Sequence, residues 1–293
     1  MKTGEWINVW LETYEAPNRR PNTIKGYRYA LAHLSPAVLD AEITHLDAIA
    51  LQREINALSA VFPRQGQILH VALHAALSRA EKLRMIENNP MRLVDKPTHE
   101  AKEAEILQPA EAIAYIDAAQ QQPAGRLLVL MLCLGLRRNE ARGLRIGDLD
   151  ESGILHIRNQ RTRDGDAPLK SRSSRRDLPL PEPFRAFFSG DPGAYLVDVS
   201  EKSLRTQHRR ALRAAGIDKN VTLHGLRHSC ATLAVDQGLP LADVQRLLGH
   251  KHIALTADLY AAHERQTALK RTTLFIYNHC YHHLEKGARL EIV

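Results

Sequence analysis

The sequence predicts a mainly α-helical protein with a small antiparallel β-sheet, divided into two domains. Three observations support this prediction. Apolar residues recur at helical spacing over residues 1–90. A polar segment at 91–105 then contains a proline and shows no apolar periodicity. Beyond it, helical segments flank residues 154–180, where short alternating runs and turn residues indicate strands. We therefore expect a helical N-terminal domain, a linker and a larger C-terminal domain.

Residues 1–90 predict four helices. The second begins at Pro21, and Thr44 is expected to cap the third. The fourth should run from Arg64 to Met85 and end at the Asn-Asn-Pro motif that closes with Pro90. The residues expected to face the core from the first three helices are Trp6, Val9, Trp10 and Tyr14, then Ile24, Tyr27, Leu31 and Leu34, then Leu46, Ile49 and Leu58. These helices can form one compact domain.

Residues 106–265 predict a second domain. A helix is expected to start at Gln108-Pro109, with Ile113 and Ile116 buried. The run 127–134 is apolar on all sides, which places it in the middle of the domain. A three-stranded antiparallel sheet is expected from 154–158, 167–170 and 177–180, followed by a helix from Ser203 to Ala215.

The charge balance favours a polyanionic partner. Forty basic and 33 acidic residues give a net charge of +7, and the isoelectric point is near 9.4. The charge is clustered: residues 158–176 hold seven Arg or Lys and two Asp, and 202–213 hold five Arg or Lys and no acidic residue. Clustering of this kind is typical of a DNA-binding surface, and solvated basic faces on a neutral scaffold are the alternative.

Cysteine use and hydropathy indicate a cytoplasmic protein. Cys133, Cys230 and Cys280 have no regular spacing, and two of them lie in apolar runs, which predicts reduced thiols without a disulfide framework. The longest apolar run is too short to span a bilayer. The N-terminus lacks the basic start and apolar core of a signal peptide.

One stretch, residues 222–260, concentrates residues that can handle a phosphate. It reads TLHGLRHSCATLAVDQGLPLADVQRLLGHKHIALTADLY. His224 and Arg227 are three residues apart, which places them on one face of a helix. The apolar residues expected to face inward behind them are Leu226, Cys230, Leu233 and Ala234.

A second short helix is expected between Pro240 and Gly249. Proline suits a helix start, and glycine suits the left-handed turn after a helix end. His250 follows this turn, and Tyr260 comes ten residues later. Alone, an HxxR pair is common on solvated helix faces and a Gly-His pair is usually only a helix cap. In this order and spacing, the combination is far more specific.

The combination resembles the tyrosine recombinase (phage integrase) family. That family carries HxLRH, then LGH, then a nucleophilic tyrosine nine or ten residues later. The matching residues are His224-Gly225-Leu226-Arg227-His228, Leu248-Gly249-His250 and Tyr260.

Upstream motifs extend the resemblance to about residues 5–262. The arginine of the family's G-x-R-x-x-E motif is matched by Arg137, between Gly135 and Glu140. Leu134 stands where the family usually has threonine, a departure that concerns packing more than chemistry.

The family also has a lysine at the turn between its second and third strands, before an Arg-rich run. Lys170 in PLKSRSSRRDLPLP matches it, and Arg163 and Arg172 are nearby basic alternatives. In the N-terminal domain, the Thr23-x-x-x-Tyr27 pair and the ending at 86–90 resemble the family's core-binding domain.

The resemblance implies that the chain cuts and rejoins DNA through a 3′-phosphotyrosine intermediate, with Tyr260 as nucleophile. The transition state concentrates negative charge on the non-bridging oxygens, and Arg137 and Arg227 would supply fixed guanidinium donors for it. A phenol has a reference pKa of about 10, so it needs a proton acceptor, for which His224 is placed.

The remaining site residues have implied supporting roles. Lys170 would protonate the leaving 5′ oxygen, and His250 would donate a hydrogen bond to the phosphate. Glu140 would orient the site without reacting. Because the phosphotyrosine linkage conserves the energy of the broken bond, resealing needs no ATP. No cofactor is expected.

The partners implied are double-stranded DNA, a homo-tetramer assembled on paired sites, and accessory DNA-bending or directionality proteins. Arg20 and Lys25 in the N-terminal domain and Arg205 and Arg209 in the basic helix are candidates for DNA contacts, and plain surface charges are the alternative. The chain begins almost at its first core-binding helix. Either it uses only core sites, or an arm-binding domain lies upstream.

The tail, residues 266–293, is expected to dock on a neighbouring protomer. A helix from about Lys270 to Lys286 would carry Leu274, Tyr277, Tyr281 and Leu284 as an apolar stripe. Related recombinases exchange such segments cyclically, and packing on its own domain is the alternative.

Other functions fit the sequence less well. A type IB topoisomerase shares this chemistry but relaxes supercoils as a monomer, and a catalytically silent DNA-binding regulator could share the fold. A two-metal nuclease needs clustered carboxylates, for which Asp148 and Asp150 form a close pair. His224 and His228 have the spacing of a zinc pair without an evident third ligand, and the His-rich tail at 278–283 could bind a metal adventitiously.

Overall fold

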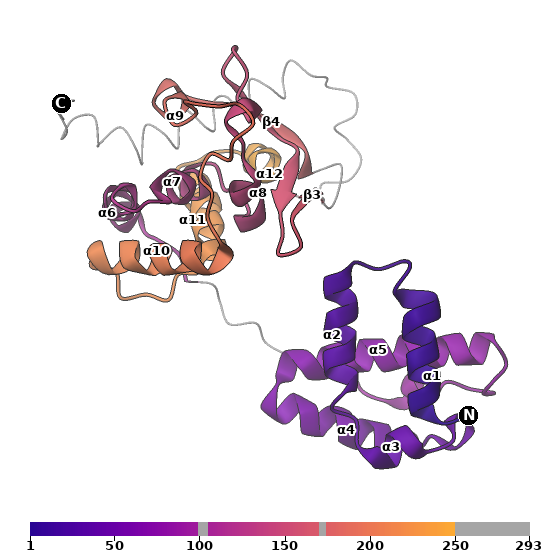
Figure 1. The fold of residues 1–293 in the computed structure, drawn as a ribbon. Helices are drawn as coiled ribbons and strands as arrows, with labels where there is room; N and C mark the ends of the chain where they lie inside the picture. Colours follow the sequence, from indigo (N-terminus) through magenta and orange to yellow (C-terminus); the bar gives the residue numbers. More distant parts are fainter. Residues whose placement is uncertain (99–104, 170–173, 250–293) are drawn as a thin grey trace. The chain divides into compact units, whose positions relative to one another are not determined.

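The computed structural model describes residues 1–98, 105–169 and 174–249 (Figure 1). The fold is mainly α-helical with small antiparallel sheets, which confirms the predicted class. The chain divides into two compact units, Met1–Lys102 and Glu103–Val293. Lys170, His250, Tyr260 and the expected tail helix lie outside the described residues.

The N-terminal unit is a helical cluster around one core, in which α1, α2 and α4 pack on α5 (Figure 1). Its helices are α1 (Thr3–Trp10), α2 (Pro21–Leu31), α3 (Pro36–Asp40), α4 (Ala48–Val61) and α5 (Pro63–Lys82). Two tryptophans fix the packing. The Trp6 indole donates to the Ala76 carbonyl at 3.0 Å, and the Trp10 ring stacks on Tyr27 with centroids 5.8 Å apart.

The third helix begins later than predicted, and one residue that was expected in its buried face is exposed. Thr44 lies in a 3₁₀ turn, Ile43–His45, and Asp47 caps α4 by accepting from the Ala50 amide. The helix therefore begins later, and Ile49 is 63% exposed. Leu58 is buried as expected, and Leu51 and Ile55 also face the core. Val9 of α1, also expected inside, is 42% exposed.

The expected linker at 91–105 differs from the structure at its beginning. A 3₁₀ turn occupies Pro90–Leu93, and the Asn89 side chain accepts from the Met91 amide at 2.9 Å. This turn directs Met91 and Val94 into the N-terminal core, where they are 1% and 6% exposed. Two apolar residues three apart are enough to extend the packed unit past residue 90.

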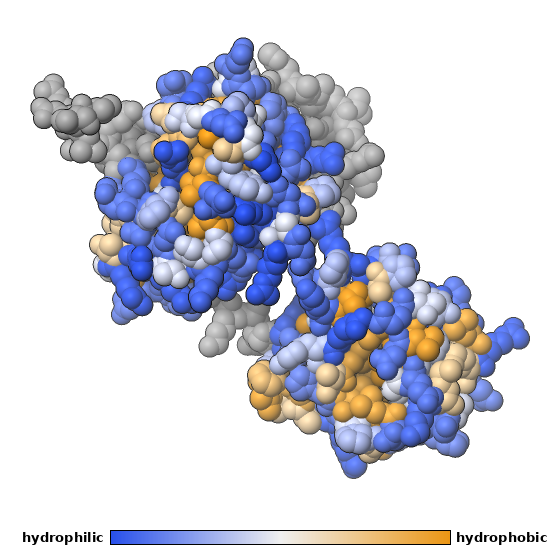
Figure 2. Space-filling view, in the orientation of Figure 1, coloured by the Kyte–Doolittle hydropathy of each residue, from blue (hydrophilic) through white to orange (hydrophobic). Residues whose placement is uncertain are grey.

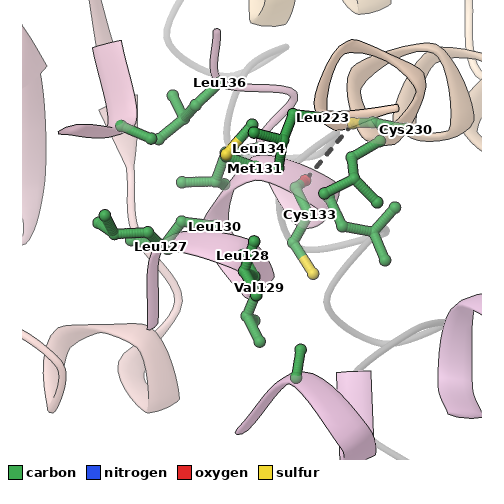
Figure 3. Close-up of a cluster of buried hydrophobic side chains, with 14 of the residues drawn as sticks. Leu127, Leu128, Val129, Leu130, Met131, Cys133, Leu134, Leu136, Leu223 and Cys230 are labelled. Carbon is green, nitrogen blue, oxygen red and sulfur yellow. Dashed lines mark hydrogen bonds between the residues drawn. The ribbon is translucent and has the colours of Figure 1, made fainter. Parts of the chain in front are cut away.

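The C-terminal unit is built around α7 (Gly125–Cys133), and Figure 3 shows its side chains packed in the core. Every residue of the run 127–134 is at most 1% exposed, as its all-round hydrophobicity predicts. The Cys230 thiol lies 3.6 Å from the Cys133 carbonyl. In α6 (Pro109–Gln120), Ile116 is buried as expected, but Ile113 is only partly buried, and Ala112 and Tyr115 fill the core.

The remaining elements surround this core. They are α8 (Arg138–Gly143), β1 (Ile154–Ile157), β2 (Asn159–Arg161), β3 (Asp166–Pro168), β4 (Arg176–Pro179), α9 (Glu182–Arg185), α10 (Glu201–Ala214), α11 (Leu223–Asp236) and α12 (Leu241–Leu248). The predicted three-stranded sheet is two antiparallel pairs, β1 with β4 and β2 with β3. Arg158 separates β1 from β2, so the first predicted strand continues into a second hairpin.

Hydrophilic side chains cover most of the visible face of the C-terminal unit, with a strip of apolar residues between them (Figure 2). Across residues 1–98, 105–169 and 174–249, no helix is both long and apolar enough to cross a bilayer.

Candidate active site

Arg227 is buried in α11 and joins two other helix ends. Thr222 caps the helix by accepting from the Gly225 amide at 2.9 Å. Arg227 is only 2% exposed, whereas the sequence predicted that it would share an outer face with His224. Its guanidinium donates to the carbonyls of Gly135 and Leu248, each at 2.7 Å. These two bonds draw the arginine inward, so the side chain ties the turn after α7 to the end of α12.

Glycine makes this junction possible. Gly135 has φ of +60°, and a Cβ there would lie 2.3 Å from the Leu248 side chain. Any other residue would be strained at this φ and would force the Leu248 side chain to move. Gly249 ends α12 in the left-handed conformation, as predicted, with φ of 66°.

Arg137 is held from the opposite side by Glu140. Its guanidinium donates to the Glu140 carboxylate at 2.7 Å and its backbone amide at 3.0 Å. Glu140 is 1% exposed and also accepts from Arg176 at 2.9 Å. Burial raises the pKa of the Glu140 carboxyl, but Arg176 and Arg137 outweigh it and lower that pKa on balance. The carboxylate is therefore an ionised anchor for two arginines.

The two site arginines converge on adjacent backbone carbonyls. Arg227 donates to Leu248, and Arg137 donates to Gly249 at 3.4 Å. The Arg137 side chain keeps 34% exposure. Burial and the charges of Arg137 and Arg176 lower the pKa of the Arg227 guanidinium to about 9, so it is charged at neutral pH. Two cations thus meet where the LGH motif begins, which is the requirement for binding a phosphate.

His224 lies one helical turn from Arg227, at the exposed side of α11. Its ring meets the ring of His228 edge-on, with centroids 4.6 Å apart. Desolvation lowers the pKa of the His224 imidazole, and the charges of His228, Arg227 and Arg137 lower it further. The imidazole is therefore neutral near pH 7, in the form that accepts a proton.

For the DNA cleavage that the sequence resemblance implies, we expect the single-turnover rate to fall on acidification with a midpoint below pH 6.5, the ordinary pKa of histidine. The lowered pKa keeps His224 unprotonated until the pH drops through that value. Rates measured from pH 5 to 8 test this, with His224→Gln as the control that should lose the acidic limb. A midpoint above 6.5 would contradict the role of His224 as proton acceptor.

A basic groove of about 710 Å³ adjoins His224 on the same unit. Arg205 and Arg209, both expected to contact DNA, lie along it with Arg138. Arg205 pairs with Glu201 at 2.6 Å, whereas Arg209 is exposed and has no ion pair with any described residue.

In the N-terminal unit, Arg20 and Lys25 are exposed on α2 and its cap. Neither has an acidic partner within the described ranges, although neighbouring Arg19 pairs with Glu15. Arg20 and Lys25 are therefore available to a phosphate backbone.

Sequence reasoning missed Arg176. It is 7% exposed and shares Glu140 with Arg137, but in the sequence it is one of several arginines in a polar run. The one available signal was its place at the start of a Pro-Leu strand. In the described ranges, no three His, Cys, Asp or Glu residues cluster as a metal site.

Comparisons with known proteins agree with this geometry. The family described as "Phage integrase family" matches residues 196–267, and "Phage integrase, N-terminal SAM-like domain" matches residues 3–59. An integrase of Streptomyces ambofaciens is 28% identical, over 87% of this chain and 74% of its own length. Tyrosine recombinase XerC of Natranaerobius thermophilus is 27% identical, over 85% of this chain and 81% of its own length.

Solved structures share the fold. The Tn1549 transposon integrase, in complex with a circular intermediate DNA, has a TM-score of 0.72 and 18% identity, and the match covers 98% of this chain and 100% of that one. A lambda integrase dimer bound to a COC′ core site has a TM-score of 0.65 and 16% identity, with 86% and 96% covered. A stretch of each unit thus matches a phage integrase model, and these relatives support assignment of the chain to the tyrosine recombinase (phage integrase) family.

Proposed function

We propose that this protein is a site-specific DNA recombinase that cuts and rejoins strands through a 3′-phosphotyrosine, in integration or excision of a phage or other mobile element. One observation supports this most directly. Arg227 donates to the Leu248 carbonyl, and Arg137, ninety residues earlier in the sequence, donates to the carbonyl of the adjacent Gly249. Their guanidiniums therefore lie at the start of the LGH motif, where they would bind the scissile phosphate in the proposed reaction.

The reaction balances without a cofactor. The Tyr260 oxygen forms a bond to phosphorus while the bond from phosphorus to the 5′ oxygen breaks. His224 takes the phenolic proton, and Lys170 gives a proton to the departing 5′ oxygen. Arg137, Arg227 and His250 stabilise the charge on the non-bridging oxygens. Attack by a 5′ hydroxyl on the phosphotyrosine reverses these steps and reseals the strand.

We propose that the protein works on duplex DNA as a tetramer, with two protomers on each of two sites. Known structures of similar fold include a lambda integrase tetramer bound to a Holliday junction, with a TM-score of 0.69. The basic groove beside His224 and the exposed Arg20 and Lys25 supply positive charge for DNA contacts on both units.

Plasmid assays test the proposal. DNA that flanks the gene in its genome is cloned as one copy or as a pair of sites and incubated with the full chain. A recombinase rearranges only the paired plasmid. Relaxation of all supercoiled plasmids, without rearrangement, would instead identify a topoisomerase. Binding without either product would identify a silent regulator.

Lys170 is expected to be the general acid. Lys170→Ala should slow cleavage of ordinary DNA by about 10²–10⁴-fold. The same variant should cleave DNA at almost the normal rate when sulfur replaces the 5′ bridging oxygen. A thiolate leaves without a proton, so this substrate makes the acid unnecessary. Arg172→Ala is the matched control, because Arg172 is a nearby basic residue that could act in place of Lys170. Equal defects of Lys170→Ala on both substrates would assign the proton to another residue.

The tail is expected to connect protomers. Deleting residues 268–293 should spare binding of one protomer to a half-site while weakening cooperative binding and strand exchange. The reason is that the apolar stripe of the tail needs a surface to bury it. Gel-shift titrations on half and full sites measure both effects. A truncated protein that recombines normally, or that fails to fold, would rule out docking on a neighbour.

A further inference from the structure

Tyr195 lies where the β2–β3 hairpin meets the rest of the C-terminal unit. Its backbone pairs with Arg145 in an isolated antiparallel bridge, and the next residue, Leu196, donates to the Leu144 carbonyl at 2.8 Å. The tyrosine backbone is therefore attached to the segment that follows α8, independently of the hairpin.

The Tyr195 side chain contacts both strands of that hairpin. Its hydroxyl lies 2.9 Å from each carboxylate oxygen of Asp166, the first residue of β3. The guanidinium of Arg161, the last residue of β2, lies over the ring at 4.1 Å from its centroid. Arg145 also lies over the ring, at 4.5 Å, and donates to Asp166 at 2.7 Å. Asp166 and Arg161 are register partners at the turn end of the hairpin.

The two strands are held differently. Strand β2 packs directly on α8: a Cβ at Gly143 would lie 2.9 Å from the Arg161 amide nitrogen, and Arg142 donates to the Arg161 carbonyl at 3.2 Å. The side-chain bonds that hold the first residue of β3 come from Tyr195 and Arg145. At its other end β3 runs into Leu169, which is 7% exposed in the core. Within the hairpin, β3 also pairs with β2, and Gln160 donates to the Pro168 carbonyl at 2.9 Å. Asp166 and Leu169 are thus the points at which groups outside the hairpin hold this strand.

The contacts of Tyr195 and Arg145 with Asp166 fix the position of β3 more than they stabilise the fold. Arg145 and Asp166 are each 39% exposed, and ion pairs at such exposure contribute little to stability. Burial raises the pKa of the Asp166 carboxyl, but the Tyr195 hydroxyl and Arg145 lower it on balance, so the carboxylate accepts both bonds at neutral pH.

We propose that Tyr195 is a positioning residue for the leaving-group acid, because it holds the start of β3, the strand that leads through Leu169 to Lys170. This inference rests on the proposed function. Tyr195 touches neither the phosphate nor the reacting atoms in this proposal. It sets the direction from which the acid reaches the 5′ oxygen, and a small displacement of an acid costs rate steeply.

The test compares cleavage of ordinary DNA with cleavage of DNA that carries sulfur at the 5′ bridging position. Tyr195→Phe keeps the ring and removes the hydroxyl bond, and Asp166→Asn removes the charge that accepts it. Each should slow cleavage of ordinary DNA on the order of tenfold and cleave the sulfur substrate at nearly the wild-type rate. Tyr115→Phe is the matched control, because it removes a buried hydroxyl bond to His208 in the same unit, away from the hairpin. Its ratio of the two rates should equal that of the wild type.

The outcomes separate this inference from the proposed function. If Tyr195→Phe slows both substrates equally, or neither, the positioning role is wrong. If Lys170→Ala is not rescued by sulfur while Tyr195→Phe and Asp166→Asn are, the positioning role stands. The acid is then another residue of the hairpin, such as Arg163. If none of the three variants is rescued, both the acid assignment and the positioning role fall.

Discussion

Tyr260→Phe should abolish covalent attachment to DNA completely while leaving DNA binding unchanged. The phenolic oxygen is the only atom that the change removes, and it is the atom that bonds to phosphorus in the proposed step. A nicked suicide substrate loses the short strand after cleavage and so cannot be resealed. The wild-type protein should therefore accumulate an adduct that survives denaturation.

Tyr277→Phe is the matched control, since it makes the same change in a tyrosine of the tail and should still give the adduct. Gel shifts on uncleaved DNA verify that both variants bind. An adduct that persists in Tyr260→Phe and maps to Tyr277 or Tyr281 would show that the nucleophile is wrongly assigned.

Arg227→Lys should reduce cleavage on the order of 10²–10³-fold and lower the free energy of unfolding of the C-terminal unit by about 1–3 kcal/mol. The arginine fork donates to the carbonyls of Gly135 and Leu248 together. A lysine keeps the charge but cannot span both carbonyls, so one buried acceptor loses its partner. Its ammonium also lacks the planar pair of donors that the phosphate oxygens require.

Single-turnover cleavage and urea denaturation measure the two effects. Arg209→Lys, the same change on the exposed side of α10, should leave both the free energy of unfolding and the chemical step unchanged at saturating DNA. Cleavage by Arg227→Lys at the wild-type rate would remove Arg227 from the transition state. A loss of stability with intact cleavage would make it a purely structural residue.

The sequence by itself determined the elements with strong local signals. The run 127–134 is apolar on every side, so it had to be central, and the structure buries it fully. Proline and glycine at either end of 241–248 predicted α12 with its left-handed cap. The order of Arg137, His224 and Arg227 among fixed motifs indicated the family resemblance, since motif spacing depends only on the chain.

Tertiary structure decided how those residues are held. That Arg227 points inward follows from two carbonyls, one in the turn after α7 and one at the end of α12, which helix periodicity cannot reveal. That Arg176, among several nearby arginines, is the buried partner of Glu140 depends on where β4 lies relative to α8. Likewise, Tyr195, Arg145 and Asp166 meet only because a loop pairs with the segment after α8. Local sequence fixes turns and faces, whereas partners distant along the chain are chosen by packing, which is why the contacts that orient the site could not be predicted.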